Sequence, residues 1–287
     1  MRQPLPVFLL AATLIGSGGA FEADGSDAAP QNAPRAGATS ITPPLPIGIE
    51  ADVYCTGWLA EPDARFPATI FSAELINSKQ GFFEGDILYV SGGVNQGFAA
   101  GQEYWIVRPE RVVNSVQSVL AVVGRVYLTP GRVRILCAQE NSSIAEIVLS
   151  CSDTNIGDSV LPFEPIPIPL VRRTAPLSSC DPESGKLSGH IVADFDTVTA
   201  IAKDSVVYLD LGEDDGLLPG DFLSVFRMPV EDRRLQIILG HPETQEERDV
   251  RIMLGEASIL TTRKKTSVAI ITSMRDTMYV GDRVELK

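Results

Sequence analysis

The sequence predicts an all-β protein with two tandem small β-barrel or sandwich domains that arose by internal duplication. Two observations lead to this fold class. First, the chain repeats a pattern of glycines and aromatic residues at a constant offset of 119 residues. Second, each copy consists of short segments rich in β-branched and aromatic residues, separated by Gly, Pro and Asp. Five or six short strands in about a hundred residues are typical of a small barrel or sandwich.

The repeat is clearest in the segments 87–109 and 206–229. Tyr89 corresponds to Tyr208, which favours a core position in both copies. The same offset pairs Gly93 with Gly212, Gly97 with Gly216, Gly101 with Gly220 and Arg108 with Arg227.

Two further segments extend the repeat. Downstream, Gly157 and Asp158 correspond to Gly281 and Asp282. Upstream, residues 55–59 align with 187–191, so that Trp58 matches His190. We expect the shared glycines to supply positive φ in tight turns. We expect the aspartate of each Gly-Asp pair to accept backbone N–H bonds that fix a turn.

The repeat also sets the domain boundaries. β-domain 1 covers 49–163 and β-domain 2 covers 181–287. The connector 164–180 has Pro at alternate positions over part of its length, which favours an extended conformation. β-domain 2 contains a charged insertion, 230–250, between two of its strands. This insertion is expected to protrude and to offer a contact surface.

The N-terminal region predicts export. Arg2 precedes an apolar run that ends in small residues up to Ala20, the pattern of a secretory signal peptide over 1–20. The run is shorter than the ~20 residues that span a bilayer, so no transmembrane span is expected. Residues 21–48 are rich in Ala, Pro, Gly and Ser and predict a disordered tether. We expect localisation in the periplasm or outer cell envelope of a Gram-negative-type bacterium.

Net charge and cysteine content indicate which partners and which redox compartment to expect. The net charge of −13 argues against nucleic acid, whose binding needs Lys and Arg to neutralise phosphates. The cysteines are even in number, which suits one or two disulfides in an oxidising compartment. Their pairing stays open, because four cysteines allow three connectivities. The candidates are Cys55, Cys137, Cys151 and Cys180.

The segment 210–221, DLGEDDGLLPGD, is the strongest candidate for a cation site. A calcium loop of the EF-hand type needs oxygen ligands at positions 1, 3 and 5 and a carboxylate at position 12. Gly212 occupies the third position, and the corresponding loop 91–101 keeps the glycines but none of the acids. We interpret the segment as a structural turn, with a weak cation site as the alternative.

The sequence contains no familiar catalytic pattern. His190 and His241 each stand alone, and neither a G-x-S-x-G nor an H-E-x-x-H motif occurs. We therefore expect a non-catalytic protein without a cofactor or metal, and a hydrolase of unknown type is the enzymatic alternative.

Aromatic and charged residues supply candidates for partner contact. Trp58 and Trp105 could stack on sugar rings in a wall-binding groove, and a core or edge position is the alternative for both. The charged insertion adds Arg233, Arg234 and His241.

The segments VYLDLGEDDGLLPGDFLSVFR, LGEASI and SVAIITSMRDTMYVGDRVEL carry a family resemblance. Together they resemble the C-terminal β-domain of flagellar assembly protein T and related bacterial envelope domains, which also occur beside peptidoglycan-binding LysM modules. The resemblance covers 203–287 well and 85–161 loosely. It implies a non-catalytic β-domain in a periplasmic ring.

These observations favour an exported structural or adaptor protein of an envelope assembly, such as a ring, secretion system, pilus or motor. Its expected partners are envelope proteins or peptidoglycan, and an oligomer is left open. The expected contact surfaces include exposed strand edges, because these invite strand addition. A peptidoglycan- or glycan-binding module is the alternative function.

Overall fold

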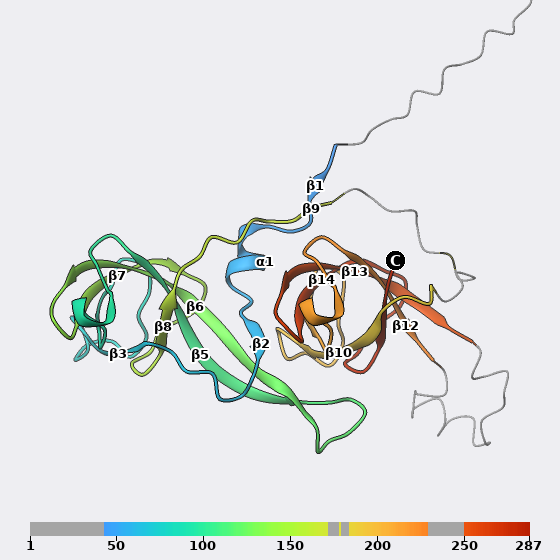
Figure 1. The fold of residues 1–287 in the computed structure, drawn as a ribbon, viewed down its shortest axis with the longest axis horizontal. Coiled ribbons are helices and arrows are strands. Elements are labelled where there is room, and N and C mark those ends of the chain that lie inside the picture. Colours follow the sequence, from blue (N-terminus) through green and yellow to red (C-terminus); the bar gives the residue numbers. More distant parts are fainter. Residues whose placement is uncertain (1–42, 172–177, 179–183, 229–249) are drawn as a thin grey trace, which may run out of the picture. The chain divides into compact units, whose positions relative to one another are not determined.

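A computed structural model describes residues 43–171, 178, 184–228 and 250–287. The described part is almost entirely β-structure and contains two closed six-stranded barrels (Figure 1). Several sequence-based predictions fall on other residues: the signal peptide, most of the tether and most of the charged insertion lie outside the described residues. So do Cys180, Arg233, Arg234 and His241.

Barrel 1 follows the strand order β6-β5-β8-β3-β4-β7 and closes through pairing of β6 with β7. A short extra strand, β2 (Trp58–Ala60), pairs with the outer edge of β6. The barrel strands are β3 (Ala68–Ala73), β4 (Ile87–Val90), β5 (Glu103–Asn114), β6 (Val122–Ala138), β7 (Ser143–Ser150) and β8 (Ser159–Pro162).

Barrel 2 repeats this topology strand for strand, with the order β10-β11-β14-β13-β12-β15. Its registers match as well: Tyr89 faces Ile144 across β4–β7, and Tyr208 faces Val268 across β11–β14. The predicted tandem barrels are confirmed. The strands are β10 (Ser188–Asp194), β11 (Val206–Leu209), β12 (Phe222–Arg227), β13 (Ile252–Thr262), β14 (Ser267–Met274) and β15 (Arg283–Leu286).

The structure corrects the upstream end of the predicted repeat. Ile70 of β3 faces Val90, and Ile191 of β10 faces Leu209, so β10 corresponds to β3. His190 therefore matches Thr69, and the match with Trp58 is wrong. Residues 55–59 and 187–191 share a glycine, but β2 is an addition to barrel 1 that has no counterpart among the described residues.

Each barrel has its own apolar core, supplied by alternate residues that point inward. In barrel 2 the core includes Ile191, Leu209 and Val225, all fully buried. In barrel 1 the corresponding positions hold Ile70, Val90 and Ile106. Full burial of one such side chain contributes roughly 1.5–3 kcal/mol, so each barrel has a core that can stabilise it.

Turns with a glycine at the third position lead into the strands. In Asn155–Asp158 and Tyr279–Asp282, the first backbone N–H donates to a carboxylate oxygen of the fourth residue, at 2.8 and 2.7 Å. Gly157 and Gly281 have φ of 98° and 105°. The turn before β12 is built the same way, since Leu218 N–H donates to Asp221 Oδ2 at 2.9 Å. The Gly-Asp pairs thus adopt the geometry that the sequence predicts.

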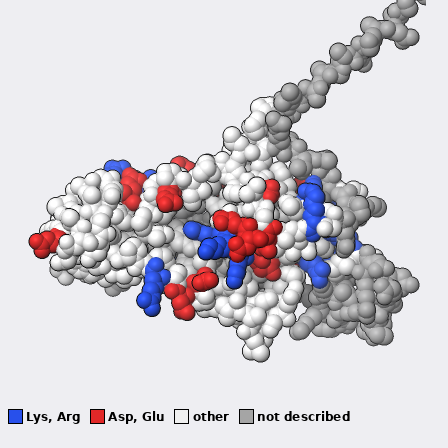
Figure 2. All heavy atoms as spheres, in the orientation of Figure 1, with Lys and Arg blue, Asp and Glu red and all other residues white. Residues whose placement is uncertain are grey.

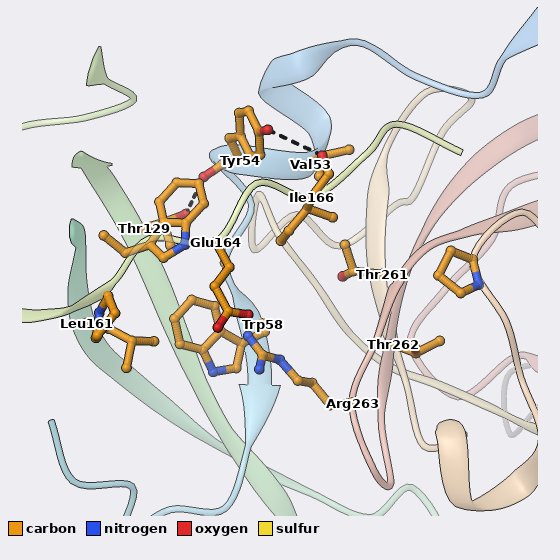
Figure 3. A pocket seen from close by; sticks show the side chains of 14 residues that line it. Val53, Tyr54, Trp58, Thr129, Leu161, Glu164, Ile166, Thr261, Thr262 and Arg263 are labelled. Carbon is orange, nitrogen blue, oxygen red and sulfur yellow. Dashed lines mark hydrogen bonds between the residues drawn. The ribbon is translucent and has the colours of Figure 1, made fainter. Parts of the chain in front are cut away.

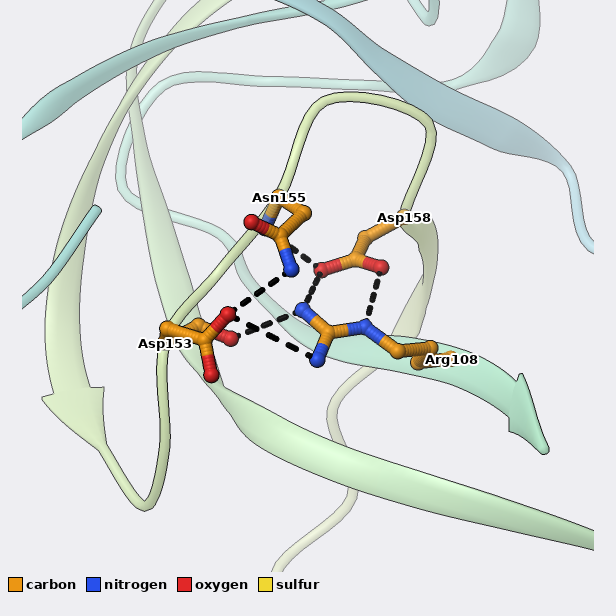
Figure 4. A network of polar contacts seen from close by, with 4 residues as sticks. All are labelled: Arg108, Asp153, Asn155 and Asp158. Atoms are coloured by element: carbon orange, nitrogen blue, oxygen red, sulfur yellow. Dashed lines mark hydrogen bonds and ion pairs between the residues drawn. The ribbon is translucent and has the colours of Figure 1, made fainter. Parts of the chain in front are cut away.

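The same aspartates hold an arginine from a neighbouring strand. Arg108 of β5 makes two hydrogen bonds of 2.8 Å to the carboxylate of Asp158 and one of 2.7 Å to the carbonyl of Asp153 (Figure 4). Arg227 binds Asp282 in the same bidentate way, at 2.7 and 2.8 Å. Both aspartates are buried, so each pair ties a turn to the barrel wall.

The chain before barrel 1 is more ordered than the sequence predicts. Within the predicted tether, β1 (Leu45–Pro46) pairs with β9 (Leu170–Val171) of the connector. One turn of helix, α1 (Glu50–Tyr54), follows. The pairing partner is more than a hundred residues away, so local composition could not reveal it. The predicted disorder is therefore wrong for this end of the tether.

Removing the Asp158 carboxylate should destabilise barrel 1. In Asp158→Ala the half-buried Arg108 guanidinium loses both charge-assisted bonds and the turn loses its cap, at a cost of about 1.5–3 kcal/mol. Asp153→Ala is the matched control, because its half-exposed carboxylate lies 3.8 Å from Arg108 and should contribute less than about 1 kcal/mol. Chemical denaturation of both variants measures this difference, and equal losses would contradict the assigned role of Asp158.

Candidate functional site

A shared apolar cluster joins the two barrels. Barrel 2 contributes the outer face of β10, β11, β13 and β14, including Tyr208 and Leu260, which are fully buried. Barrel 1 contributes Leu59 of β2, Val126 of the β5–β6 hairpin and Val53 of α1. All four residues of β11 are buried, because one face packs in the barrel core and the other packs in this cluster. We call this region the joint.

Polar contacts add to the joint. The Tyr208 hydroxyl donates to the carbonyl of Thr56 at 2.6 Å, and the Thr266 hydroxyl donates to the carbonyl of Leu59. The Arg111 guanidinium of β5 donates to the carbonyl of Asp194 in β10. These carbonyls lie in the buried contact, so each would lose a partner if the barrels separated.

A disulfide attaches α1 and β2, which we call the covering segment, to barrel 1. Cys55, at the end of α1, is bonded to Cys151, which follows β7. Thr129 of β6 also donates to the carbonyl of Tyr54 at 2.7 Å. The bond selects one pairing among those that the sequence left open, and Cys137 is an exposed free thiol. The disulfide therefore anchors the segment that packs against barrel 2.

An open cleft of about 500 Å³ lies beside the joint (Figure 3). Helix α1 and β2 line it together with Trp105 of β5, Glu164 of the connector and Arg263 of the β13–β14 hairpin. It lies within the size range of small-molecule sites, and aromatic and charged groups converge on it. The cleft is therefore a candidate site, because aromatic and charged side chains line it together.

The two tryptophans differ in their availability to a ligand. Trp105 is buried against Tyr54 and Phe163, with ring centroids 5.2 and 4.7 Å apart. Trp58 is half-buried, and its ring is stacked near Tyr127 at 6.2 Å. The structure therefore gives Trp105 a packing position, whereas Trp58 retains an exposed part on the cleft.

The charged groups of the cleft are Arg263 and Glu164. The Arg263 guanidinium carbon lies 4.8 Å from the centroid of the Trp58 ring, a cation–π contact. Desolvation in this position lowers the pKa of Arg263, while Glu213 and Glu164 act in the opposite direction. The arginine remains charged, so the cleft offers a cation over an aromatic face beside a carboxylate.

The acidic segment 210–221 forms a turn around a short 3-10 helix, Glu213–Asp215. Asp210 accepts a 2.6 Å bond from His190 N–H, and Asp215 accepts one of 2.9 Å from Gly212 N–H. Among the residues that the structure describes, no three His, Cys, Asp or Glu side chains group as metal ligands. Asp215 and Asp221 therefore fix their own turns, whereas Asp210 and Glu213 join the segment to β10 and β13.

The glycines of the two equivalent loops serve two purposes. Gly97 and Gly216 have φ of 87°, and Gly101 and Gly220 also have positive φ, as predicted. Gly93 and Gly212 instead have extended backbone, so the prediction of positive φ is wrong for these two glycines. A Cβ on Gly93 would lie 2.4 Å from the carbonyl oxygen of Gln139, and one on Gly212 would lie 2.3 Å from that of Arg263. These two glycines are needed because another chain segment approaches closely.

The surface carries charges of both signs. On the face in Figure 2, Lys and Arg lie among Asp and Glu, with wide uncharged areas between them. In the described part of the chain, no helix is both long and apolar enough to cross a bilayer.

Sequence reasoning identified Trp58 and Trp105 but missed most of the joint. Thr56, Tyr208 and Thr266 make polar contacts in it, and the sequence predicts only a core position for Tyr208 and no contact for the two threonines. One signal was available: all four residues of β11 are large and apolar or aromatic, as in a strand that is buried on both faces.

Comparison with known proteins adds no assignment. No known family model matches the chain, and no curated protein matches it.

The duplication supplies a matched test of the joint. Tyr208→Phe removes the hydroxyl from the buried Thr56 carbonyl and should cost about 1–2 kcal/mol. Tyr89→Phe alters the corresponding residue of barrel 1, which is half-buried, and should cost less than about 0.5 kcal/mol. Thermal and denaturant unfolding of both variants would decide, and an equal effect would show that the Tyr208 bond does not stabilise the joint.

Burial also gives Tyr208 a defined pH dependence. It raises the pKa of Tyr208 above its ordinary value of 10.0, so the unfolded state loses this proton first. The stability contributed by the protonated hydroxyl is complete below about pH 10 and is lost as the pH rises further. We expect alkaline unfolding to be less steep in Tyr208→Phe than in the wild type. An unchanged pH profile would contradict the burial of this residue.

Calcium tests the acidic segment 210–221. Because Asp215 and Asp221 already accept backbone N–H bonds, millimolar calcium should shift the melting temperature by less than about 1 °C, in line with weak or absent binding. Magnesium at equal ionic strength is the control. A calcium-specific rise of several degrees would establish a cation site.

Proposed function

We propose that this chain is a non-catalytic structural adaptor of an exported envelope assembly and that it contacts another protein through the tip of the β5–β6 hairpin. The hairpin tip, residues 115–121, carries the observation on which this proposal rests. Val119 and Leu120 are 80% and 92% exposed. Adjacent apolar side chains at this exposure are typical of a surface that a partner covers.

The position of the hairpin supports this proposal. Val113, just before the tip, packs in the joint, and Arg111 bonds to barrel 2. The tip is therefore a short apolar projection on a base that both barrels hold. A rigid base lowers the conformational entropy that binding has to overcome.

Several polar side chains stabilise turns and loops of the fold, which is consistent with a structural adaptor. Arg108, Asp158 and their barrel 2 counterparts stabilise turns, and Asp194 caps a loop through Val198 N–H at 2.7 Å. The resemblance of 203–287 to the C-terminal β-domain of flagellar assembly protein T points to the same class of envelope function. The signal-peptide pattern over 1–20 favours export.

The hairpin tip is tested by affinity recovery from the native envelope. A C-terminally tagged wild type should recover a partner protein in stoichiometric amounts. The variant Val119→Ser/Leu120→Ser should recover at least about 10-fold less, because two large contacts are lost. Quantitative mass spectrometry measures the ratio of partner to tagged chain.

The matched control is Val198→Ser/Val280→Ser, which changes two exposed valines of barrel 2. It should leave recovery unchanged. Equal recovery by wild type and the tip variant would refute the tip as the contact. Recovery of muropeptides without a protein would instead support binding to the cell wall.

A second candidate function is glycan binding in the cleft. The observation that favours it is the convergence of Trp58, Arg263 and Glu164 on one open volume of about 500 Å³. Sugar rings stack on tryptophan faces, and their hydroxyls pair with charged groups. A sugar that stacks on Trp58 would have to share its ring with Arg263, which already contacts it.

Co-sedimentation with purified peptidoglycan sacculi tests this candidate. Trp58→Ala should reduce bound protein at least about 10-fold if the cleft binds glycan, as expected for a central aromatic contact. Arg263→Ala probes the same cleft from barrel 2. If the wild type itself does not co-sediment, the glycan candidate fails.

A further inference from the structure

Arg263 occupies a turn that both barrels share, but only barrel 2 places a charge there. In the hairpin that joins β13 to β14, Arg263 N–H donates to the carbonyl of Thr266 at 2.8 Å. The Arg263 carbonyl accepts a bond of 2.8 Å from Glu213 N–H. In barrel 1, Gln139 forms the same two backbone bonds with the equivalent residues. The turn itself therefore does not require an arginine at this position.

The Arg263 guanidinium is positioned over an aromatic ring but has no acceptor. Figure 3 shows it beside Trp58, with its carbon 4.8 Å from the centroid of that ring. No described residue forms a hydrogen bond or an ion pair with this guanidinium, and the side chain is exposed. Other arginines of the fold, such as Arg108 and Arg251, bind carboxylates of the protein itself. Arg263 therefore presents its N–H donors to a ligand in the cleft.

Several other polar side chains of the cleft already bind the protein. The Thr129 hydroxyl donates to the carbonyl of Tyr54 at 2.7 Å, and the Tyr54 hydroxyl donates to the carbonyl of Ile166 at 3.3 Å. Much of the remaining lining is apolar and includes Val53 and Leu161. A sugar ring needs several free partners for its hydroxyls, whereas a ligand with one anionic group on an apolar body needs only the guanidinium and the apolar wall. The cleft suits the second kind of ligand better.

The charges around Arg263 indicate which anion fits. An arginine binds carboxylates and phosphates in a bidentate way. Glu164 also lines the cleft and lies close enough to act electrostatically on Arg263. Its negative charge repels a doubly charged phosphate monoester more strongly than a singly charged carboxylate. The net charge of the chain, −13, acts in the same direction. A single carboxylate is therefore the anion that suits this cleft best.

We propose that the cleft binds the carboxylate of a peptide, with Arg263 holding the carboxylate and Trp58 supporting the adjoining apolar part. A peptide joins a carboxylate, at its end or on a side chain, to apolar groups that the lining can bury. This binding goes beyond the proposed contact at the hairpin tip. It also assigns to the cleft a different ligand class from the glycan of the second candidate function.

Tryptophan fluorescence reports directly on this cleft, because the chain has two tryptophans, Trp58 and Trp105, and both line it. The probes are the peptide acetyl-Ala-Ala-Leu with a free carboxylate and the same peptide with a C-terminal amide, each titrated to millimolar concentration. The free acid should change the fluorescence in a saturable way. The amide should bind at least about 10-fold more weakly, because it lacks the charge that Arg263 binds.

Substitutions of Arg263 test its role. Arg263→Gln should weaken binding of the free acid at least about 10-fold and leave the amide unaffected, so that the two peptides bind alike. Arg263→Lys keeps the charge but not the bidentate geometry and should bind with intermediate affinity. Arg65→Gln is the matched control, because Arg65 is exposed and does not line the cleft, and it should bind like the wild type. Unchanged melting temperatures verify that the variants fold.

Further probes identify the source of the carboxylate. The peptide acetyl-Ala-Glu-Ala amide carries its carboxylate on a side chain. Tighter binding of this peptide than of acetyl-Ala-Ala-Leu would assign the cleft to an acidic residue within a peptide, and the reverse order would assign it to a chain end. N-acetylmuramic acid carries a carboxylate on a sugar, and inorganic phosphate is an anion without an apolar body. Neither should compete with the peptide acids.

Four results would overturn the proposal: no binding of either peptide acid, equal binding of acetyl-Ala-Ala-Leu and its amide together with no binding of the side-chain acid, wild-type binding by Arg263→Gln, or tighter binding of N-acetylmuramic acid than of both peptide acids. The last result would support the glycan candidate. None of these results depends on the hairpin tip, since Val119→Ser/Leu120→Ser should bind the peptide acids normally. Failure of peptide binding and failure of the adaptor function are therefore distinguishable.

Discussion

Coverage of the outer face of barrel 2 is the constraint on which much of this structure depends. A barrel strand normally buries one face, but every residue of β11 is buried and apolar or aromatic. The second face would be a large apolar patch if it stood alone. The β5–β6 hairpin, β2 and α1 cover it. The need to cover this face explains why barrel 1 carries a long hairpin and an additional strand.

Other features stabilise this cover rather than either barrel. The Cys55–Cys151 disulfide closes a separation of 96 residues and holds α1 and β2 on barrel 1. For a loop of this size, a disulfide contributes roughly 4–5 kcal/mol in the chain-entropy model. The connector adds Ile166 and Ile168, which pack on the cluster while Pro165 and Pro167 are exposed. The disulfide and the connector contacts each make the covering segment less able to detach from barrel 2.

The two barrels show how one backbone can serve two environments. The Arg108–Asp158 pair and its counterpart are retained because both barrels need the same link between a strand and a turn. Tyr89 and Tyr208 keep the same residue with different surroundings, since only Tyr208 is covered. Function in this chain is therefore proposed where the copies differ, at the hairpin tip and in the cleft.

The sequence by itself determined what depends on neighbouring residues. Strand patterns and glycine spacing were sufficient for the all-β class, the duplication and the turns at Asp158 and Asp282, because backbone conformation and turn hydrogen bonds involve only a few consecutive residues. Only the tertiary structure decided the pairing of Cys55 with Cys151, the close approaches at Gly93 and Gly212, the order of residues 45–46, and the burial of Tyr208 but not Tyr89. Each of these depends on distant segments, as with Thr266 and Leu59, which bond across 207 residues. No local pattern encodes which surface will be covered, because that depends on where the rest of the chain packs.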